Sequence, residues 1–191
     1  ATRPRHRHQA RTHARRMVEL ANIRPSDRVL EPSAGTGNIL KALGNAPDKM
    51  AVEISGPLVQ ALAQSGLSGL RVHEGDFLTC APTDLGSSFD AVLMNPPFAH
   101  GADIAHVTHA LNFLRPTGRL VAIMGSHMTF ATDKASVTFR ALLEHYGATV
   151  EPLPADTFAD SGTQVNTVLV VIRLPTWCQT PNPVTHHSCR S

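Results

Sequence analysis

A rigid run of hydrogen-bond acceptors, Asn95-Pro96-Pro97-Phe98, follows the apolar stretch 89–94. Two successive prolines fix the backbone φ angle twice and remove two N–H donors. The Asn95 side-chain oxygen and the Pro96 carbonyl oxygen remain as acceptors, which suits a substrate that carries an NH₂ group. Hydrogen bonds accepted from such a nitrogen bring its lone pair into line for attack, and the fixed dipoles stabilise the positive charge that develops on it. Phe98 would stack on a planar substrate such as a flipped base. The structural alternative is a Pro-Pro turn with this ring in the core.

A second run, at 30–38, lies between an apolar run and a helix-like run and reads Leu-Glu-Pro-Ser-Ala-Gly-Thr-Gly-Asn. The pattern predicts a strand, a tight glycine turn and a helix N-terminus, whose free N–H groups face a nucleotide-type cofactor. Gly35 and Gly37 permit backbone angles that a Cβ forbids. They also let the ligand lie against the main chain, beside Ser33 and Ala34.

This loop differs from the two common phosphate-binding loops. It lacks the third glycine of the dinucleotide fingerprint and the Gly-Lys-Ser/Thr of a P-loop. Instead, Glu31 stands four residues before the first glycine. A carboxylate in that position repels phosphate and attracts an ammonium group. The pattern therefore indicates a cofactor with a cationic amino-acid end, such as S-adenosylmethionine, although an ordinary strand-to-helix turn with a surface acid is the alternative.

Two further acids are expected at strand ends. Glu53 ends a predicted strand about 20 residues beyond the glycine loop, where an acid accepts hydrogen bonds from ribose hydroxyls. Ile54 would pack on an adenine ring. Asp76 follows the next predicted strand and could accept from an exocyclic amino group, with Phe77 offering an apolar face. The alternative is a turn aspartate before a packed phenylalanine.

Predicted strands alternate with predicted helices, which is typical of a mostly parallel sheet with helices on both faces. A turn-rich link before the last predicted strand favours an antiparallel pair at one end of the sheet. The strands are expected near 28–31, 50–54, 71–74, 89–94, 119–124, 148–153 and 165–174. The helices are expected near 11–21, 39–43, 55–64, 103–114 and 136–146.

Charges are distributed unevenly along the 191 residues, although the net charge is only +2. Residues 1–16 carry six arginines and no acid, whereas the remainder carries eleven basic and fifteen acidic side chains. A basic arm on a mildly acidic body favours a polyanionic partner, although a solvated tail would have the same composition. The hydrophobic content of 42% is typical of a globular protein. We expect a basic arm at 1–10, a globular catalytic domain at 11–174 and a loose tail at 175–191.

The sequence gives no sign of export, a membrane or a metal. No apolar run approaches the roughly 20 residues that span a bilayer, and no apolar signal segment opens the chain. Cys80, Cys178 and Cys189 form neither a disulfide framework nor a Cys-x-x-Cys pair, so we expect a reducing, cytoplasmic setting. The histidines at 100, 106 and 109 are expected to be solvated, and metal binding at 186–189 is not expected.

Four stretches, in this order, resemble the class I S-adenosylmethionine-dependent methyltransferases that modify amino groups. They lie at 30–37, 52–54 (Val-Glu-Ile), 75–77 (Gly-Asp-Phe) and 95–98. The resemblance covers residues 11–174 and implies a Rossmann-like sheet of seven strands with a reversed last strand. It implies roles in the site as follows: Glu31, Gly35 and Gly37 hold the methionine end of the cofactor, Glu53 the ribose, Asp76 the adenine, and Asn95, Pro96, Pro97 and Phe98 the target amine.

Among these enzymes, the N6-adenine DNA methyltransferases are the most similar. Two departures matter: Thr12-His13 stands where that family has Thr-Pro before its first helix, and the chain has no room for a target-recognition domain. A separate specificity partner or the basic arm would then supply sequence readout. We expect methylation of adenine N6 in DNA before RNA. The open alternatives are guanine N2 or adenine in structured RNA, a glutamine amide in a protein, and a non-catalytic module that binds nucleic acid.

Overall fold

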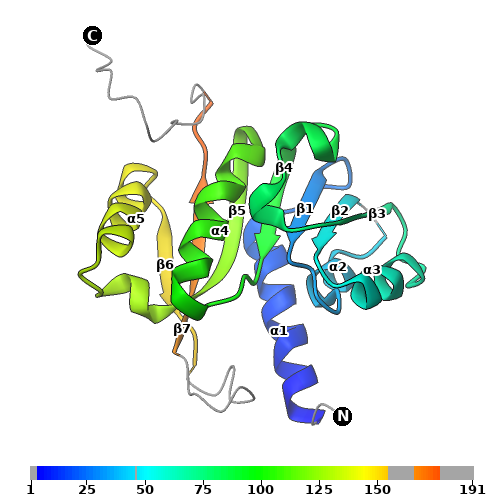
Figure 1. The fold of residues 1–191 in the computed structure, drawn as a ribbon, viewed down its shortest axis with the longest axis horizontal. Coiled ribbons are helices and arrows are strands. Elements are labelled where there is room, and N and C mark those ends of the chain that lie inside the picture. The colour runs from blue at the N-terminus through cyan, green and yellow to red at the C-terminus, as the bar shows by residue number, and fades with distance from the viewer. Residues whose placement is uncertain (1–3, 46, 155–165, 177–191) are drawn as a thin grey trace.

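The computed structural model describes residues 4–45, 47–154 and 166–176, with side chains from residue 11 onward. Its centre is a seven-stranded sheet in the order β3-β2-β1-β4-β5-β7-β6 (Figure 1). The strands are β1 Arg28–Pro32, β2 Asp48–Glu53, β3 Leu70–Glu74, β4 Phe89–Met94, β5 Leu114–Gly125, β6 Thr149–Pro152 and β7 Thr167–Arg173. The α-helices are α1 Pro4–Ala21, α2 Asn38–Leu43, α3 Gly56–Ala63, α4 Ala102–Ala110 and α5 Lys134–His145. The short 3-10 turns are η1 Phe77–Thr79, η2 Pro82–Leu85, η3 Ala99–Gly101, η4 Leu111–Phe113 and η5 Ser126–Thr129.

The direction of the strands confirms the expected topology. Strands β1 to β5 are parallel, whereas β7 pairs antiparallel with both β5 and β6. The chain moves outward from β1 to β3 and then returns to place β4 on the other side of β1. At such a reversal of strand order, a crevice opens at the carboxyl ends of the two central strands.

Alternate side chains of the central strands pack into two core layers, one on each face of the sheet. On one face, Leu30, Val92 and Met124 pack with buried residues of α4 and α5. On the other face, Val29 and Ile123 pack with the apolar sides of α1, α2 and α3. Figure 1 shows α4 and α5 in front of the sheet and α1 behind it. The prediction of helices on both faces is therefore confirmed.

Helix α1 is longer than the sequence pattern indicates, because it begins at Pro4 instead of near residue 11. The backbone of 4–10, expected to belong to an arm, is therefore helical. The last turn is held by arginines of the sheet: Arg119 donates to the Ala21 and Asn22 carbonyls, and Arg173 donates to the Leu20 carbonyl. These bonds satisfy carbonyls that a helix end leaves open. The N-terminal half of α1 projects beyond the lower edge of the sheet in Figure 1.

Strand β5 also differs from expectation, since it starts at Leu114 and not near 119. Pro116 and Gly118 follow the expected helix 103–114; Leu114 pairs with Phe89, and a bulge in which Thr117 has a φ angle of 64° accommodates the extra residues. A Cβ on Gly118 would lie 2.7 Å from the Arg115 carbonyl oxygen, so only glycine fits there. No helix in the described part of the chain is long and apolar enough to cross a membrane.

Candidate active site

A cavity of about 220 Å³ lies at the carboxyl ends of β1 and β4. The glycine loop after β1 forms one side of it, Asn95 after β4 another, and α1 with the end of β5 closes it. The lining residues are His13, Ala14, Met17, Glu31, Ser33, Ala34, Gly35, Thr36, Asn38, Ile39, Asn95 and Ile123. The structure therefore brings together the two sequence motifs that lie about 60 residues apart, at the place where parallel sheets bind ligands.

Glu31 is the buried acid of this cavity. It is 3% exposed, and one carboxylate oxygen accepts a hydrogen bond from the Leu40 N–H of α2 at 3.0 Å. Burial raises the pKa of the Glu31 carboxyl well above its ordinary value, and the nearby charge of Glu53 acts in the same direction. A cationic ligand beside this carboxyl would reverse the shift, because an opposite charge favours the ionised form.

The glycine loop adopts a backbone that few residues tolerate. Ser33, Gly35 and Gly37 all have positive φ angles, of 60°, 54° and 73°. A Cβ built on Gly35 would meet nothing within 4 Å, so its open side faces free space. A Cβ on Gly37 would lie 2.7 Å from a methyl carbon of Leu62. Gly35 thus leaves room for a ligand, whereas Gly37 allows α2 and α3 to pack and does not line the cavity.

Glu53 ties the end of β2 to the glycine loop. Its two carboxylate oxygens accept from the Gly35 N–H at 2.7 Å and from the Ser55 N–H at 2.9 Å. The side chain is 7% exposed and does not line the cavity. Each oxygen keeps a second lone pair that could accept from a hydroxyl group. Ile54 follows it and is 69% exposed, which leaves an apolar surface beside the loop.

The turn that contains Asp76 and Phe77 differs from expectation. Asp76 caps η1, where its carboxylate accepts from the Leu78 N–H at 3.0 Å. Phe77 is only 2% exposed, and its ring packs against His109 and Phe113 at centroid distances of 4.9 and 5.0 Å. In this structure the Phe77 ring therefore offers no face to a ligand, because residues of α4 and η4 cover it.

Of the acceptor run after β4, Asn95 lines the cavity, whereas Pro96, Pro97 and Phe98 are not among its lining residues. Asn95 and Pro97 are exposed, Pro96 is buried, and Phe98 is half-buried against the core layer of α1 to α3. The residues that follow turn sharply, since His100 has a φ angle of 55°. The run is thus anchored by buried Pro96 and half-buried Phe98, while Asn95 is exposed and lines the cavity.

Asp103 fixes the position of the same loop relative to β5. This carboxylate is 5% exposed and accepts from the Gly125 N–H at 2.9 Å and the Ile104 N–H at 2.9 Å. A Cβ on Gly125 would lie 4.0 Å from the Phe98 Cβ, so the end of β5 lies directly beside the acceptor run. Burial raises the pKa of the Asp103 carboxyl, although its backbone hydrogen bonds act in the opposite direction.

Sequence reasoning missed the cavity residues of α1 and β5. His13, Ala14 and Met17 come from α1, and Ile123 comes from the buried part of β5. The spacing of Ala14, Met17 and Ala21 marks one helical face, which would have indicated that α1 packs against the sheet. Burial also lowers the pKa of the His13 imidazole.

Among the described residues, the histidines are not grouped as metal ligands. Contrary to expectation, His106 is buried, and its ring centroid lies 6.1 Å from that of Phe77. The His109 Nε2 atom forms a hydrogen bond with the Cys80 carbonyl oxygen. Within 4–45, 47–154 and 166–176, no three His, Cys, Asp or Glu side chains are grouped as metal ligands. The histidine- and cysteine-containing segment 186–189 lies outside the described residues.

The chemistry of the cavity fits S-adenosylmethionine. Glu31 supplies a negative charge for an ammonium group, and the open side of Gly35 leaves space for a ligand against the backbone. Glu53 has acceptor capacity left for ribose hydroxyls, and Ile54 offers an apolar surface. The cavity is smaller than the roughly 300–1,000 Å³ of typical ligand pockets, so it matches one end of this cofactor.

Comparison with known structures gives the same fold. A class I S-adenosylmethionine-dependent methyltransferase of Listeria monocytogenes superposes with a TM-score of 0.70 at 14% identity, over 91% of this chain and 62% of that one. The M protein of the type I restriction enzyme EcoKI gives 0.65 at 16% identity, over 86% and 43%. An rRNA methylase of Streptococcus thermophilus gives 0.59 at 14% identity, over 86% and 95%. The chain therefore spans less than two thirds of the first two proteins.

Comparison with family models identifies the chain itself. No curated protein matches it. The model of the methyltransferase small domain matches residues 14–147, which include the glycine loop, the acids after β2 and β3 and the acceptor run. The chain belongs to the methyltransferase small domain family and has the fold of the class I S-adenosylmethionine-dependent methyltransferases.

Proposed function

We propose that this protein transfers a methyl group from S-adenosylmethionine to an exocyclic amino group, with adenine N6 in DNA as the first substrate. One observation carries the proposal: Asn95 of the acceptor run and Glu31 of the glycine loop line the same cavity. A cation held by Glu31 and an amine held by Asn95 would therefore meet in one enclosed space. Family membership supports the reaction class, and the acceptor run supports the amine.

The residues of the chain would act mainly by orientation and charge. When bound, S-adenosylmethionine supplies a methyl group on a positively charged sulfur, which leaves as a neutral thioether. The Asn95 side-chain oxygen and the Pro96 carbonyl would accept both N–H bonds of the amine and direct its lone pair to the methyl carbon. Nitrogen becomes positive as its bond to carbon forms, and the same two oxygens stabilise that charge. The methylated nitrogen then releases one proton to solvent water; because the proton is lost after attack, no base is needed before it.

Phe98 and the turn after it would hold the planar base. The Phe98 side chain is half-buried and its Cβ lies beside Gly125, so its ring could offer a surface on which a base stacks. Bases inside a duplex cannot reach such a site without leaving the stack. A mismatched or single-stranded adenine is therefore expected to react faster than a paired adenine.

The choice of DNA rests on the resemblance to N6-adenine DNA methyltransferases and on the neighbouring M protein of a type I restriction enzyme. Residues 1–16 carry six arginines, which would attract a phosphate backbone. The chain spans 43% of that M protein. In this proposal a separate specificity partner supplies sequence readout. RNA is the second candidate, since the rRNA methylase neighbour is covered over 95% of its length.

The experiment is a transfer assay with a labelled methyl donor and three acceptors: single-stranded DNA, structured RNA and protein. The proposal predicts label in DNA, recovered as N6-methyladenine after hydrolysis. Label in RNA alone would favour the second candidate. Label in protein glutamine, or in no acceptor while the donor still binds, would contradict the proposal.

A further inference from the structure

The turn η5, directly after β5, exposes an aromatic pair. Phe130 is 67% exposed, which is unusual for a large apolar side chain, and His127 is exposed beside it. Their rings meet edge to face with centroids 5.4 Å apart. An edge-to-face pair keeps one ring face open and restricts the motion of both rings.

The backbone below this pair is firmly held. The Phe130 and Ala131 N–H groups both donate to the His127 carbonyl, at 3.2 and 3.0 Å. Arg140 of α5 donates to the Met128 carbonyl at 2.8 Å, and Met128 itself is buried. The exposed rings therefore stand on a fixed turn, so little conformational entropy would be lost when a partner binds them.

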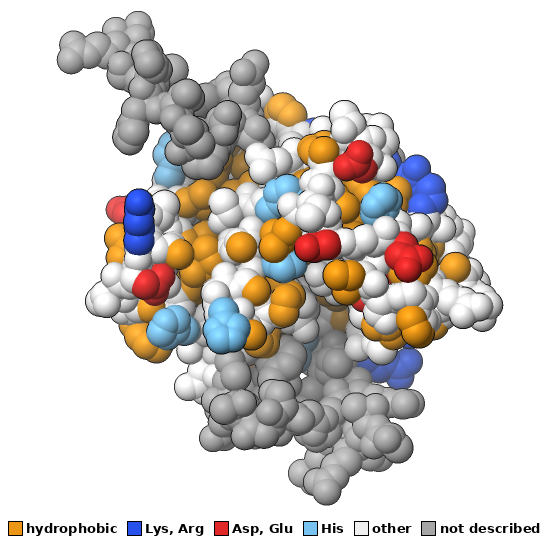
Figure 2. Space-filling model, viewed as in Figure 1, with side chains coloured by type: hydrophobic (Ala, Val, Ile, Leu, Met, Phe, Trp, Pro, Cys, Tyr) orange, Lys and Arg blue, Asp and Glu red, His pale blue; other side chains and the backbone are white. Residues whose placement is uncertain are grey.

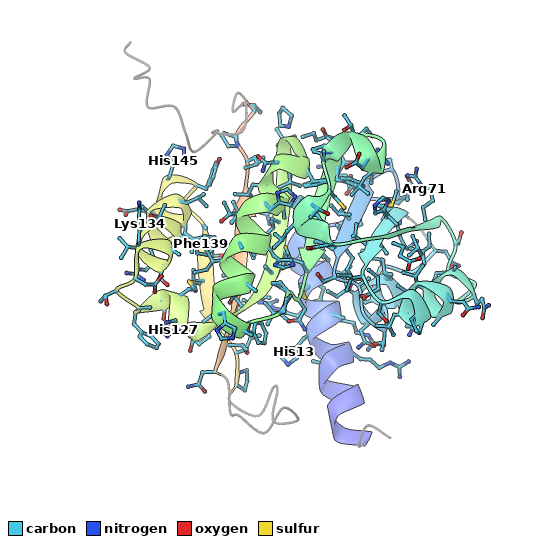
Figure 3. The ribbon with its side chains drawn as sticks, in the orientation of Figure 1. His13, Arg71, His127, Lys134, Phe139 and His145 are labelled. Atoms are coloured by element: carbon cyan, nitrogen blue, oxygen red, sulfur yellow. The ribbon has the colours of Figure 1, made fainter. Side chains whose placement is uncertain are left out.

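The aromatic pair lies at the same edge of the sheet as the acceptor run. Gly125 is the residue before η5, and a Cβ on it would lie 4.0 Å from the Phe98 Cβ. Figure 3 places His127 of η5 and His13 of α1 along one lower edge of the molecule. In Figure 2, histidine and hydrophobic side chains gather along that edge. The aromatic pair therefore follows the end of β5, which lies beside Phe98 of the proposed target site.

Charge at this edge favours an anionic partner. Arg11, Arg15 and Arg16 of α1 are exposed, and α1 projects past the sheet on this side; Arg16 also forms an ion pair with Glu151 at 3.6 Å. Two acids lie near the turn: Asp103 is buried and accepts from the Gly125 N–H, and Asp133 uses both carboxylate oxygens to cap α5 through the Ser136 N–H and hydroxyl. Exposed rings together with arginines are the combination that binds single-stranded nucleic acid.

We infer that His127 and Phe130 form a stacking platform for an unpaired base next to the target nucleotide. The inference rests on the proposed function and names a second contact of the same substrate. Stacking is tolerant of sequence, because every base has a π face. The platform would hold single-stranded or locally opened nucleic acid near Asn95, and it would leave sequence readout to another partner.

The test compares Phe130→Ala with the matched control Val137→Ala, an apolar residue of α5 that is 49% exposed. Fluorescence anisotropy measures the affinity of the full chain for a labelled, adenine-containing single-stranded oligodeoxynucleotide at several salt concentrations. Phe130→Ala should weaken binding about 5- to 100-fold without changing the salt dependence, because stacking releases no counterions. Phe130→Trp should restore the affinity, and Val137→Ala should match the wild type.

Three outcomes would overturn the platform. In the first, the wild type methylates the oligonucleotide and Phe130→Ala binds it as tightly as the wild type. This result would rule out the platform but not the proposed function. The second is a lower melting temperature for Phe130→Ala with unchanged affinity, which would mean that the ring packs against its own chain. The third is a wild type that neither binds nor methylates nucleic acid, which would overturn the proposed function as well.

Discussion

The two edges of the sheet treat their charged groups differently. At the amino edge, Arg119 forms an ion pair with Asp27 and also donates to three backbone carbonyls. Lys49 is fully buried there and donates to the Pro47 and Ser68 carbonyls at 2.8 and 2.7 Å. At the carboxyl edge, Glu31 and Glu53 are buried but accept only from backbone N–H groups. Among the described residues, neither acid forms an ion pair with Lys or Arg.

This difference separates structural charges from functional ones. At the amino edge, the Arg119–Asp27 ion pair satisfies both of its charges within the chain, whereas Lys49 donates to backbone carbonyls and burial lowers its pKa. The carboxyl edge leaves two acids close together, and burial raises the pKa of one of them. Such an arrangement costs stability and is typical of a site that waits for a cation. Removal of a charged group at the amino edge should therefore lower the stability of the fold. Removal of a buried acid at the carboxyl edge should weaken ligand binding and raise the stability of the free protein.

The largest effect is expected for Asn95→Ala. Loss of the amide oxygen removes one fixed acceptor from the developing positive charge, so the rate of methyl transfer should fall by about 10²- to 10³-fold. Affinity for S-adenosylmethionine, measured by calorimetry, should stay within a factor of about three because Glu31 and the glycine loop are intact. The exposed Asn112 of η4 gives a control at the amino edge, and Asn112→Ala should behave like the wild type. Equal turnover in both variants would contradict the role of Asn95.

Arg119→Ala tests the amino edge. Its removal leaves Asp27 buried without its cation and frees helix carbonyls, so the free energy of unfolding should fall by about 3–5 kcal/mol. Arg115, whose side chain is 43% exposed and pairs with Asp90, is the control. Arg115→Ala should cost at most about 1 kcal/mol. Urea unfolding measures both, and similar losses would erase the distinction between the two arginines.

Glu31→Gln should weaken the binding of S-adenosylmethionine and raise the melting temperature of the free protein. Affinity for S-adenosylmethionine should fall about 10- to 100-fold, because a charge-assisted contact with the ammonium group is lost. A raised pKa means that the neutral carboxyl stabilises the fold, and this stabilisation is lost as the pH rises through the folded-state pKa. Without ligand, the variant should therefore melt at a higher temperature than the wild type at pH 8. The difference should vanish near pH 4.5, the ordinary pKa of glutamate.

Thermal melts across this pH range check the sign of the Glu31 effect. A variant that is less stable than the wild type at pH 8 would mean that the carboxylate is satisfied in the free protein. The cavity would then have no unmet charge to offer a ligand.

A comparable effect on cofactor affinity is expected for Glu53→Ala. It removes the acceptor of the Gly35 N–H and the expected ribose contact, so cofactor affinity should weaken by about 1–3 kcal/mol. Glu74 ends the neighbouring strand β3 and is exposed, which makes Glu74→Ala the matched control. Titration calorimetry should distinguish the two variants. Unchanged affinity in Glu53→Ala would count against the ribose contact.

Much of this fold could be predicted from the sequence, because apolar runs and glycines favour strands and helix ends through the conformations of neighbouring residues. The apolar run 89–94 is β4 with the expected limits, and Gly44 ends α2 as expected. The reversed strand β7 was also predicted. The start of β5 was not, because Pro116 and Gly118 read as the stop of a helix and only pairing with β4 and β7 makes them part of a strand. Pairing of this kind is tertiary and leaves no local signal.

Residues of the site were predictable from the sequence only where a motif lies in a loop that directly follows a strand. Glu31, Ser33, Ala34, Gly35 and Asn95 line one cavity as their motifs indicated. Phe77 was expected to face a ligand but is buried, because its environment depends on α4. His13 was not predicted to line the cavity, although Thr12-His13 stands where similar enzymes have Thr-Pro, because its position depends on how α1 crosses the sheet.

A crystal structure of the protein with S-adenosylhomocysteine would test the central claim most directly. The account predicts the amino-acid end of the ligand against Glu31 and the glycine loop, with the sulfur facing the Asn95 side-chain oxygen across the cavity. A ligand bound elsewhere, or a sulfur separated from Asn95 by a protein side chain, would contradict it.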